Sequence, residues 1–399
     1  MHTQDTTSGA RNGAAIASGL EGICVTKTRL SRVDGQRGQL VIGGFPVEEL
    51  APHASFEDVL HLLWYSRLPS PEEADELQVT LARQRHLPEA SLALLRAAAK
   101  RGVPHMDALR MAIASLTLAD PHPTDQTREA QLRRAQAMVA SFPTAVAAYA
   151  RLRRGLEPVT PNAALSHAAN YLHMLHGEPQ HADRVRALET YLNTVVDHGM
   201  NASTFTARVI ISTRSDMVSA LSGAIGALKG PLHGGAPGPA LDMVFEIRDR
   251  AARSGRTLAE EAEAWVQETL TSGGRIMGFG HRVYKVRDPR AEVLGVAAAR
   301  LFEKAGDRSL YDVVRTVEQV VVRVLHEHKP DRRLETNVEF YTALLLHGIG
   351  LDSDLFTPTF AIARAGGWTA HVLEQVDEDR LIRPDSLYVG DEGRHWEAA

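Results

Sequence analysis

The sequence predicts an all-α, multi-helical fold with one small β-hairpin near the N-terminus. Helical spacing of apolar residues recurs along most of the 399-residue chain. Long strand-like runs alternating with helices, which a doubly wound α/β sheet would need, do not occur. Hydrophobic residues make up 44% of the chain and charged residues 23%, so there are enough apolar side chains for a large core in two or three domain-sized units.

The N-terminal part is expected to differ from the rest. Residues 1–18 predict a flexible tail. Residues 22–44 contain two short β-branched runs on either side of Asp34-Gly35. An Asp-Gly pair between such runs favours a tight turn, so this stretch predicts the hairpin.

Five later segments show clear helical periodicity: 56–70, 135–155, 184–203, 311–329 and 357–376. The first is expected to stop at its proline, Pro69. Pro143 is expected to kink or break the second, because proline lacks the amide hydrogen that a helix interior uses. In the last segment, Gly366 and Gly367 predict close packing against a neighbouring element.

Composition excludes several classes of protein. The net charge of −5 gives no nucleic-acid footprint. Cys24 is the only cysteine, which excludes an intramolecular disulfide framework and a CxxC metal site, and predicts a reducing, cytoplasmic setting. No segment has the apolar length of a membrane span, and the N-terminus lacks the pattern of a secretory signal.

Three glycine-containing stretches carry histidines. In residues 230–244, His233 stands just before an expected helix start. The positive end of a helix lowers the pKa of a nearby imidazole, and a neutral imidazole can donate a hydrogen bond to a developing oxyanion. On local chemistry alone, a polar turn with an incidental histidine is the commoner explanation.

Residues 274–293 combine glycines, His281 and several cations, which predicts an anion site. The spacing fits neither a P-loop nor a dinucleotide fingerprint, and a basic surface turn is the alternative. In residues 195–209, His198 lies beside Gly199; a hydrogen-bonded core histidine is the alternative there.

Residues 335–346, ETNVEFYTALLL, place Glu339 between a turn-like Thr336-Asn337 and an apolar run. Asn337 is a good helix N-cap, and the helix dipole favours a carboxylate in the first turn. On this ground alone, a solvated first-turn charge is favoured over a catalytic base.

Four motifs favour a functional role for these residues over the structural alternatives. DHGMNAST, GPLHGG, GFGHRVYKVRDPR and NVEFY occur in this order, and on them the chain resembles the citrate synthase family. The resemblance runs from residue 19 to about residue 390, nearly the whole chain.

The resemblance implies an almost entirely helical fold with a large and a small domain and an active site in the cleft. After the tail 1–18, the large domain is expected over 19–234, an inserted small domain over 235–344, and a return to the large domain over 345–399.

The resemblance further implies an acyltransferase of the tricarboxylic acid cycle. It would condense acetyl-CoA with oxaloacetate and hydrolyse the citryl thioester to citrate and CoA. No metal or redox cofactor is implied. A homodimer, or a ring built from dimers, is implied as the assembly.

By motif, His233 would hold the enol oxygen of acetyl-CoA, His281 would bind and protonate the oxaloacetate carbonyl, and Glu339 would remove the methyl proton. The implied oxaloacetate or citrate ligands are His198, Arg290, Arg364 and Arg383, the last supplied across the dimer interface. The positions implied for contacts with CoA phosphates are Lys285, Arg332 and Arg333.

General chemistry agrees with these roles. Three arginines can clamp the two carboxylates of oxaloacetate with planar, bidentate geometry. Removing a proton next to a thioester needs a base on one side and an oxyanion donor on the other. Domain closure would exclude water from the enolate.

Glu339 departs from the family, which usually has aspartate there. The extra methylene displaces the carboxylate by up to about 1.5 Å, and a misplacement of about 1 Å can cost on the order of a hundredfold in rate. A set-back helix start could compensate for the longer arm. Alternatively the site could prefer propionyl-CoA and make 2-methylcitrate, or the protein could be a citrate- or CoA-binding regulator with little turnover. Because the three histidines and three arginines are retained, an active enzyme is favoured.

Pro237 is a milder departure, since the family often has asparagine after HGGA. Proline fixes the helix start and removes one amide donor.

Overall fold

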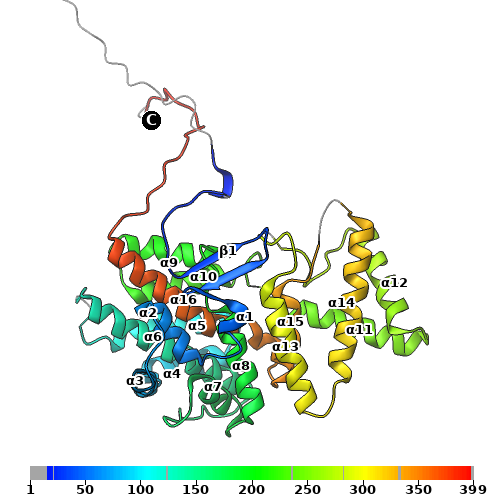
Figure 1. Cartoon of the computed structure of the whole chain (residues 1–399). Coiled ribbons are helices and arrows are strands. Elements are labelled where there is room, and N and C mark those ends of the chain that lie inside the picture. The colour runs from blue at the N-terminus through cyan, green and yellow to red at the C-terminus, as the bar shows by residue number, and fades with distance from the viewer. Residues whose placement is uncertain are drawn as a thin grey trace, which may run out of the picture. The chain divides into compact units, whose positions relative to one another are not determined.

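A computed structural model describes residues 16–20, 22–122, 125–234, 237–281, 283–330 and 334–396. It divides into two compact units, one of residues 28–381 and one formed by the terminal segments 1–27 and 382–399. The larger unit holds nearly all of the secondary structure, and the all-α prediction is confirmed (Figure 1).

The elements of the larger unit follow one another as β1 (Ser31–Asp34), β2 (Gln39–Ile42), β3 (Phe45–Pro46), α1 (Val47–Leu50), α2 (Phe56–Tyr65), α3 (Pro71–Arg83), α4 (Glu89–Lys100), α5 (His105–Ala114), η2 (Ser115–Ala119), α6 (Arg128–Arg153), α7 (His167–His176), α8 (Ala182–Val195), α9 (Ala202–Ser212), α10 (Met217–Leu228), α11 (Pro237–Ser254), α12 (Leu258–Thr271), α13 (Pro289–Lys304), α14 (Ser309–His328), α15 (Val338–Gly348), η3 (Ser353–Leu355) and α16 (Phe356–Glu378).

The predicted hairpin is confirmed. Strands β1 and β2 are antiparallel, with Asp34 opposite Gln39, and the short β3 joins them as an unpredicted third strand. The Asp34 carboxylate closes the turn by accepting the amide hydrogens of Gln36 and Arg37 at 3.1 and 2.9 Å. At the turn, the Gly35 carbonyl accepts the Lys285 amide at 2.8 Å, so the hairpin supports a loop that is distant in sequence.

Helix α16 is the central helix of the larger unit (Figure 1). It packs against α2, α5, α6, α8, α9 and α10. The predicted close packing is present: a Cβ at Gly367 would lie 2.3 Å from the Val196 carbonyl oxygen, and one at Gly366 would lie 2.7 Å from a Leu60 methyl group. These glycines let α16 approach the segment that follows α8.

Two helix predictions need correction. Helix α6 runs through Pro143, so the predicted break is wrong, while a kink stays a prediction. Every residue from Met138 to Ala150 is buried, so packing on all sides outweighs the one hydrogen bond that proline removes. Helix α2 ends at Tyr65, before Pro69, because Ser66 takes the left-handed conformation (φ 62°) and caps it.

The other periodic segments form helices as predicted, and 184–203 divides into α8 and α9 around a loop. Helices α11 and α12 pack together, α12 packs on α14, and α13 packs on α15. They lie together at one side of the larger unit (Figure 1). The boundaries predicted for a small domain at 235–344 stay a prediction.

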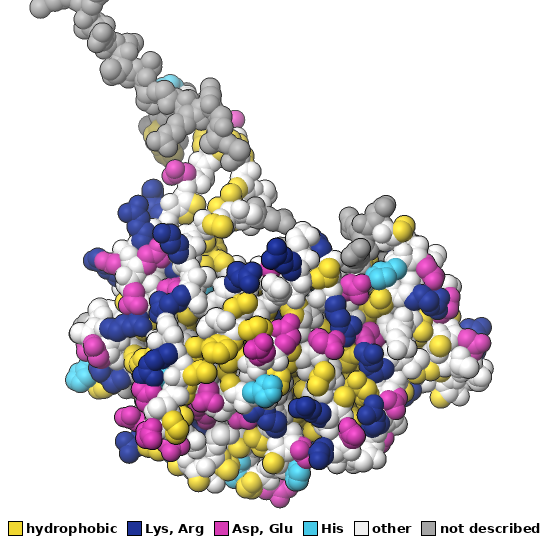
Figure 2. Space-filling view, viewed as in Figure 1, with side chains coloured by type: hydrophobic (Ala, Val, Ile, Leu, Met, Phe, Trp, Pro, Cys, Tyr) yellow, Lys and Arg dark blue, Asp and Glu magenta, His cyan; other side chains and the backbone are white. Residues whose placement is uncertain are grey.

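Of the predicted tail, residues 1–15 lie outside the described residues, and Ser18–Leu20 form a 3-10 helix. Within the described ranges, no helix combines the length and apolar character needed to cross a membrane. Lysine and arginine side chains are interspersed with acidic ones over the face seen in Figure 2.

The packing of α16 predicts a strong effect of Gly367→Ala. The new methyl group would collide with backbone, which cannot give way cheaply, so we expect a loss of about 2 kcal/mol or more in the free energy of unfolding, measured by chemical denaturation. Gly295→Ala is the matched control. Its Cβ would lie an ordinary 3.4 Å from the Tyr341 ring, and equal losses in both variants would contradict this account of the packing.

Candidate active site

The residues singled out in the sequence come from five separate places in the fold. His198 lies in the loop between α8 and α9, and His233 follows α10. His281 lies in the loop before α13, Glu339 in the first turn of α15, and Arg364 in α16. The structure brings several of them together: the His198 and His281 ring centroids are 5.9 Å apart, with the Tyr284 ring 5.6 and 4.9 Å from them.

Backbone hydrogen bonds fix the tautomer of His281. Its Nδ1 accepts the amide hydrogens of Val283 and Tyr284 at 3.0 and 3.1 Å. A neutral imidazole then carries its proton on Nε2. Burial, with Arg290 adding to it, lowers the pKa of His281 to about 4. The ring is therefore neutral near pH 7. Its Nε2 lies 3.4 Å from an amino group of Arg290, but the two shorter backbone bonds at Nδ1 assign the proton to Nε2.

Arg290 is held by its own turn. Asp288 accepts from the Arg290 amide at 3.0 Å, from its Nε at 3.0 Å and from its NH2 group at 2.8 Å. The same carboxylate caps the start of α13 and accepts the Val338 amide at 3.3 Å. Asp288 thus fixes the guanidinium and ties it to the start of α15.

Further bonds join the start of α15 to the loop carrying His281. Asn337 caps the helix by accepting the Glu339 amide at 3.0 Å, and its side-chain nitrogen donates to the Gly280 carbonyl at 2.8 Å. The Asn337 amide donates to the Gly278 carbonyl at 3.0 Å, and Phe279 and Thr336 form a β-bridge. These hydrogen bonds therefore hold the segments that carry Glu339 and His281 in a fixed position relative to each other.

A buried carboxylate supports this piece from behind. Glu318 of α14 is 3% exposed. It accepts hydrogen bonds from Arg287, Arg315, Thr336 and Tyr341 at 2.6 to 2.7 Å. Because its oxygens are fully used, Glu318 acts as a structural anchor rather than a reactive group.

Glu339 has the opposite character. Asn337 caps its amide, as expected for a first-turn residue, but the described residues give its partly buried carboxylate no hydrogen bond. Burial raises its pKa to about 7, against the opposing effect of Arg290. A carboxylate balanced between its two protonation states near neutral pH suits a general base.

Arg364 is a buried cation with free donors. It is 1% exposed, and its Nε donates to the Val195 carbonyl at 2.9 Å. No hydrogen bond from the described residues holds its two amino groups. Burial lowers its pKa to about 10, so it remains charged and can bind an anion.

His198 lies between Arg364 and the His281 loop. Burial, with Arg290 and Arg364 adding to it, lowers its pKa well below the ordinary value. Its Nε2 is 3.0 Å from the Tyr284 hydroxyl. Two arginines and neutral imidazoles thus gather in one region, and this set of groups is suited to binding a small organic anion.

His233 lies beside this group. Its Nε2 is 2.8 Å from the Ser203 hydroxyl, which also accepts the Trp368 indole hydrogen at 3.1 Å. Its pKa is lowered to about 4, mainly by burial and further by Arg364. The neutral imidazole expected from its place before a helix is supported, with burial as the main cause.

Sequence reasoning missed three side chains at the site. Ser203 and Tyr284 contact site histidines, and Tyr191 of α8 has a fully buried hydroxyl without a partner among the described residues. Burial, with Glu339 adding to it, raises the pKa of Tyr191 well above its ordinary value. Ser203 and Tyr284 fall inside the quoted motifs, which was a usable signal; Tyr191 carried none.

The structure does not test the roles predicted for the remaining residues. Arg332 and Arg333 lie outside the described residues, and Lys285 is exposed. Arg383 is exposed in the terminal unit. Their predicted roles stay predictions.

Comparisons with known proteins agree with one another. The family model for the C-terminal domain of citrate synthase matches residues 19–385. The chain is 41% identical to citrate synthase of Haloferax volcanii, over 94% of this chain and 96% of that protein. It is 38% identical to 2-methylcitrate synthase of Mycobacterium tuberculosis, over 95% and 92%. Its fold matches that of Thermoplasma acidophilum citrate synthase, solved in a ternary complex with carboxymethyl coenzyme A and oxaloacetate, with a TM-score of 0.86, 29% identity and coverage of 96% and 98%.

The raised pKa of Glu339 predicts a pH-dependent stability difference. An acid with a raised pKa in the fold keeps its proton longer there than in the unfolded chain, so its ionisation destabilises the fold as pH rises. The window runs from about 4.5 to about 7. Glu339→Gln should therefore gain stability over wild type across this window and hold it above, by at most about 3 kcal/mol.

Chemical denaturation of both proteins from pH 5 to pH 8.5 measures this difference. Substitution of the exposed Glu303 by Gln is the control and should show no such trend. A difference for Glu339→Gln that stays constant with pH would contradict the account of its carboxylate.

Proposed function

The chain belongs to the citrate synthase family, and from this premise we propose that it condenses acetyl-CoA with oxaloacetate and releases citrate and CoA. Family membership makes it a citrate synthase-type enzyme of the acyltransferase class. It supports, in general terms, the condensation of a thioester with oxaloacetate. The choice of thioester and the role of each side chain are the parts that we propose.

Glu339 is the observation that carries the proposal. In this mechanism its carboxylate removes a proton from the methyl group of the thioester. Its pKa of about 7 provides a base at neutral pH, and no hydrogen bond from the described part of the chain occupies its oxygens. If Glu339 had only a structural role, partial burial of its carboxylate without a hydrogen-bond partner would cost stability and bring no benefit.

His233 would receive the negative charge that forms on the thioester oxygen. With Nε2 engaged by Ser203, the other ring nitrogen is left to serve a ligand. The Ser203 hydroxyl donates to the Asn201 side-chain oxygen at 2.8 Å. If substrate binding redirects that single proton to Nε2, the imidazole proton would lie on Nδ1, from which it could be donated to the enolate oxygen. The low pKa keeps the ring neutral, so the donated proton is shared rather than lost.

Oxaloacetate would occupy the space between Arg364 and Arg290. The free amino groups of Arg364 suit one carboxylate, and the guanidinium of Arg290 suits the other. The Nε2 hydrogen of His281 would bind the ketone oxygen and be transferred to it as the carbon–carbon bond forms. His198 would add a further ligand to the anion.

The thioester intermediate would then be hydrolysed, releasing CoA. The atoms balance with one water consumed. In this hydrolysis, water adds to the thioester carbonyl and its proton leaves with the CoA sulfur as the free thiol. We propose that neither stage needs a metal or redox cofactor.

The choice of thioester rests on the extra methylene of Glu339. A longer side chain takes up room beside the methyl carbon that it must reach, which favours the smaller acetyl group over propionyl. The likeness to 2-methylcitrate synthase makes propionyl-CoA the alternative substrate.

We further propose a homodimer in which Arg383 of the partner subunit completes the anion site. Exposure of Arg383 in the terminal segment is compatible with that role. Lys285, Arg332 and Arg333 would contact CoA phosphates. A cytoplasmic setting remains the expectation drawn from the single cysteine.

Thiol release with oxaloacetate tests the reaction and the base together. Wild type should release CoA from acetyl-CoA faster than from propionyl-CoA. Glu339→Gln should lose at least about a hundredfold in kcat, because a general base typically contributes that much. Faster turnover of propionyl-CoA would identify a 2-methylcitrate synthase.

Glu339→Asp serves as the matched variant. If wild type is as slow as Glu339→Gln while Glu339→Asp is active, the longer arm has disabled the site, and the proposed activity is wrong.

The buried cation predicts a specific effect of Arg364→Lys. Lysine keeps the charge but lacks the planar fork, so the KM for oxaloacetate should rise on the order of a hundredfold while the KM for the thioester changes little. Steady-state kinetics measure both. The exposed Arg253 changed to Lys is the control, and an unchanged oxaloacetate KM in Arg364→Lys would remove Arg364 from the anion site.

A further inference from the structure

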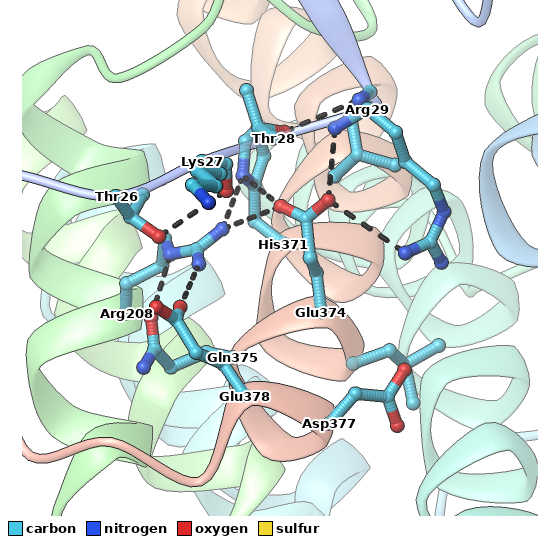
Figure 3. Close-up of polar contacts among 12 residues, drawn as sticks. Thr26, Lys27, Thr28, Arg29, Arg208, His371, Glu374, Gln375, Asp377 and Glu378 are labelled. Atoms are coloured by element: carbon cyan, nitrogen blue, oxygen red, sulfur yellow. Dashed lines mark hydrogen bonds and ion pairs between the residues drawn. The ribbon is translucent and has the colours of Figure 1, made fainter.

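A chain of buried polar groups lies behind the loop that carries His198. It begins at Arg208 of α9, which is 0% exposed. Its guanidinium donates to four side chains of α16: His371 at 3.2 Å, Glu374 at 2.7 Å, Gln375 at 2.8 Å and Glu378 at 3.1 Å. Figure 3 shows Arg208 directed at these residues, which lie along one side of the helix.

The direction of the hydrogen bonds in this chain is fixed. Arginine can only donate, so the Nδ1 of His371 must accept from Arg208. The imidazole proton then lies on Nε2, which is 3.1 Å from an oxygen of Asp197. His371 therefore donates to Asp197, and Arg208 prevents the opposite arrangement.

Asp197 links His371 to the loop that carries His198. The carboxylate is fully buried, and its second oxygen accepts the Ser31 hydroxyl hydrogen. Ser31 of β1 in turn accepts the Gly199 amide at 2.9 Å. Gly199 turns the chain in the left-handed conformation (φ +58°), so both ends of the Asp197–Gly199 turn are tied down.

His198 stands between these two tied residues. Close packing at Gly367 brings α16 against the Asp197 carboxylate, and the neighbouring Val195 carbonyl orients Arg364. A shift of Asp197 would therefore move an imidazole and a guanidinium of the proposed anion site at the same time.

We propose that His371 is a positioning residue for oxaloacetate binding, acting through Asp197 on the His198 loop. This inference rests on the proposed function, in which His198 and Arg364 bind oxaloacetate. Removing the His371 donor would leave the Asp197 charge short of a partner, and the turn would relax from the geometry that faces the substrate. His371 itself lies behind the loop and touches no reacting atom.

A purely structural role predicts something different. If His371 only fills the core, replacing it would lower stability without a selective effect on one substrate. Positioning predicts weaker oxaloacetate binding with an unchanged KM for the thioester, and recovery when the donor and acceptor are restored.

Three variants separate these possibilities. His371→Leu removes both hydrogen bonds. His371→Gln keeps one acceptor for Arg208 and one donor for Asp197. His167→Leu is the matched control, because His167 is also 0% exposed in a helix, yet its ring nitrogens have no partner among the described residues.

Oxaloacetate binding is measured by calorimetry in the absence of thioester, together with KM values and thermal stability. We expect His371→Leu to weaken oxaloacetate binding by roughly tenfold or more, as loss of a hydrogen bond to a charged group does. Its thioester KM should stay within about twofold. His371→Gln should recover most of the affinity, and His167→Leu should bind oxaloacetate as wild type does.

Ser31→Ala provides a second test of the inference if the His371→Leu protein does not fold. It removes the hydroxyl donor to Asp197, leaving the long 3.4 Å bond from the Gly199 amide, with a small change in volume. It should also weaken oxaloacetate binding several-fold. Unchanged oxaloacetate affinity in His371→Leu, or in Ser31→Ala where His371→Leu cannot be purified, would overturn the inference. Equal losses in His371→Gln and His371→Leu, or in His167→Leu, would also overturn it. Failure of wild type to bind oxaloacetate or to turn over would instead refute the proposed function.

Discussion

The site depends on the partly buried carboxylate of Glu339, to which the described residues give no hydrogen bond. Ionised groups in such surroundings are costly, and the cost appears here as a Glu339 pKa of about 7. The fold can hold the Glu339 carboxylate because hydrogen bonds of neighbouring residues fix the start of α15. Asn337 satisfies the amides and carbonyls around it, and Asp288 binds both Arg290 and the helix start. The reactive group is thus free while its support is fully bonded.

Elsewhere in the fold, other hydrogen-bonded groups likewise hold the site residues in place without taking part in the reaction. Glu318 uses both oxygens to hold the base-bearing segment from behind, and the hairpin holds the neighbouring loop through Gly35. On the other side, α16 carries Arg364 and the His371 chain. Its glycines let it approach the His198 loop closely enough for both to act. In this region, Glu318 has both oxygens bonded and is structural, whereas Glu339 has no hydrogen bond from the described residues and is available for chemistry.

Much of this was predictable from the sequence, and the limits have physical causes. The hairpin, α14 and α16 follow from local periodicity and turn chemistry, which the sequence records directly. The break predicted at Pro143 is absent because the effect of proline is local, while the packing that keeps the helix continuous comes from distant helices. Glu339 was recognisable only from its motif, since its local context is that of an ordinary first-turn charge. Tyr191 was missed because a buried hydroxyl becomes unusual only once its neighbours are known.

The central claim is that Glu339 removes the proton next to the thioester. The most direct measurement is exchange of the α-hydrogens of the acyl-CoA that wild type turns over, in D2O. A dicarboxylate such as malate, which resembles oxaloacetate but lacks its ketone, would fill the anion site. Exchange would then report proton removal without condensation. The account predicts measurable exchange in wild type and a loss of at least about a hundredfold in Glu339→Gln. Equal exchange rates in the two proteins would contradict it.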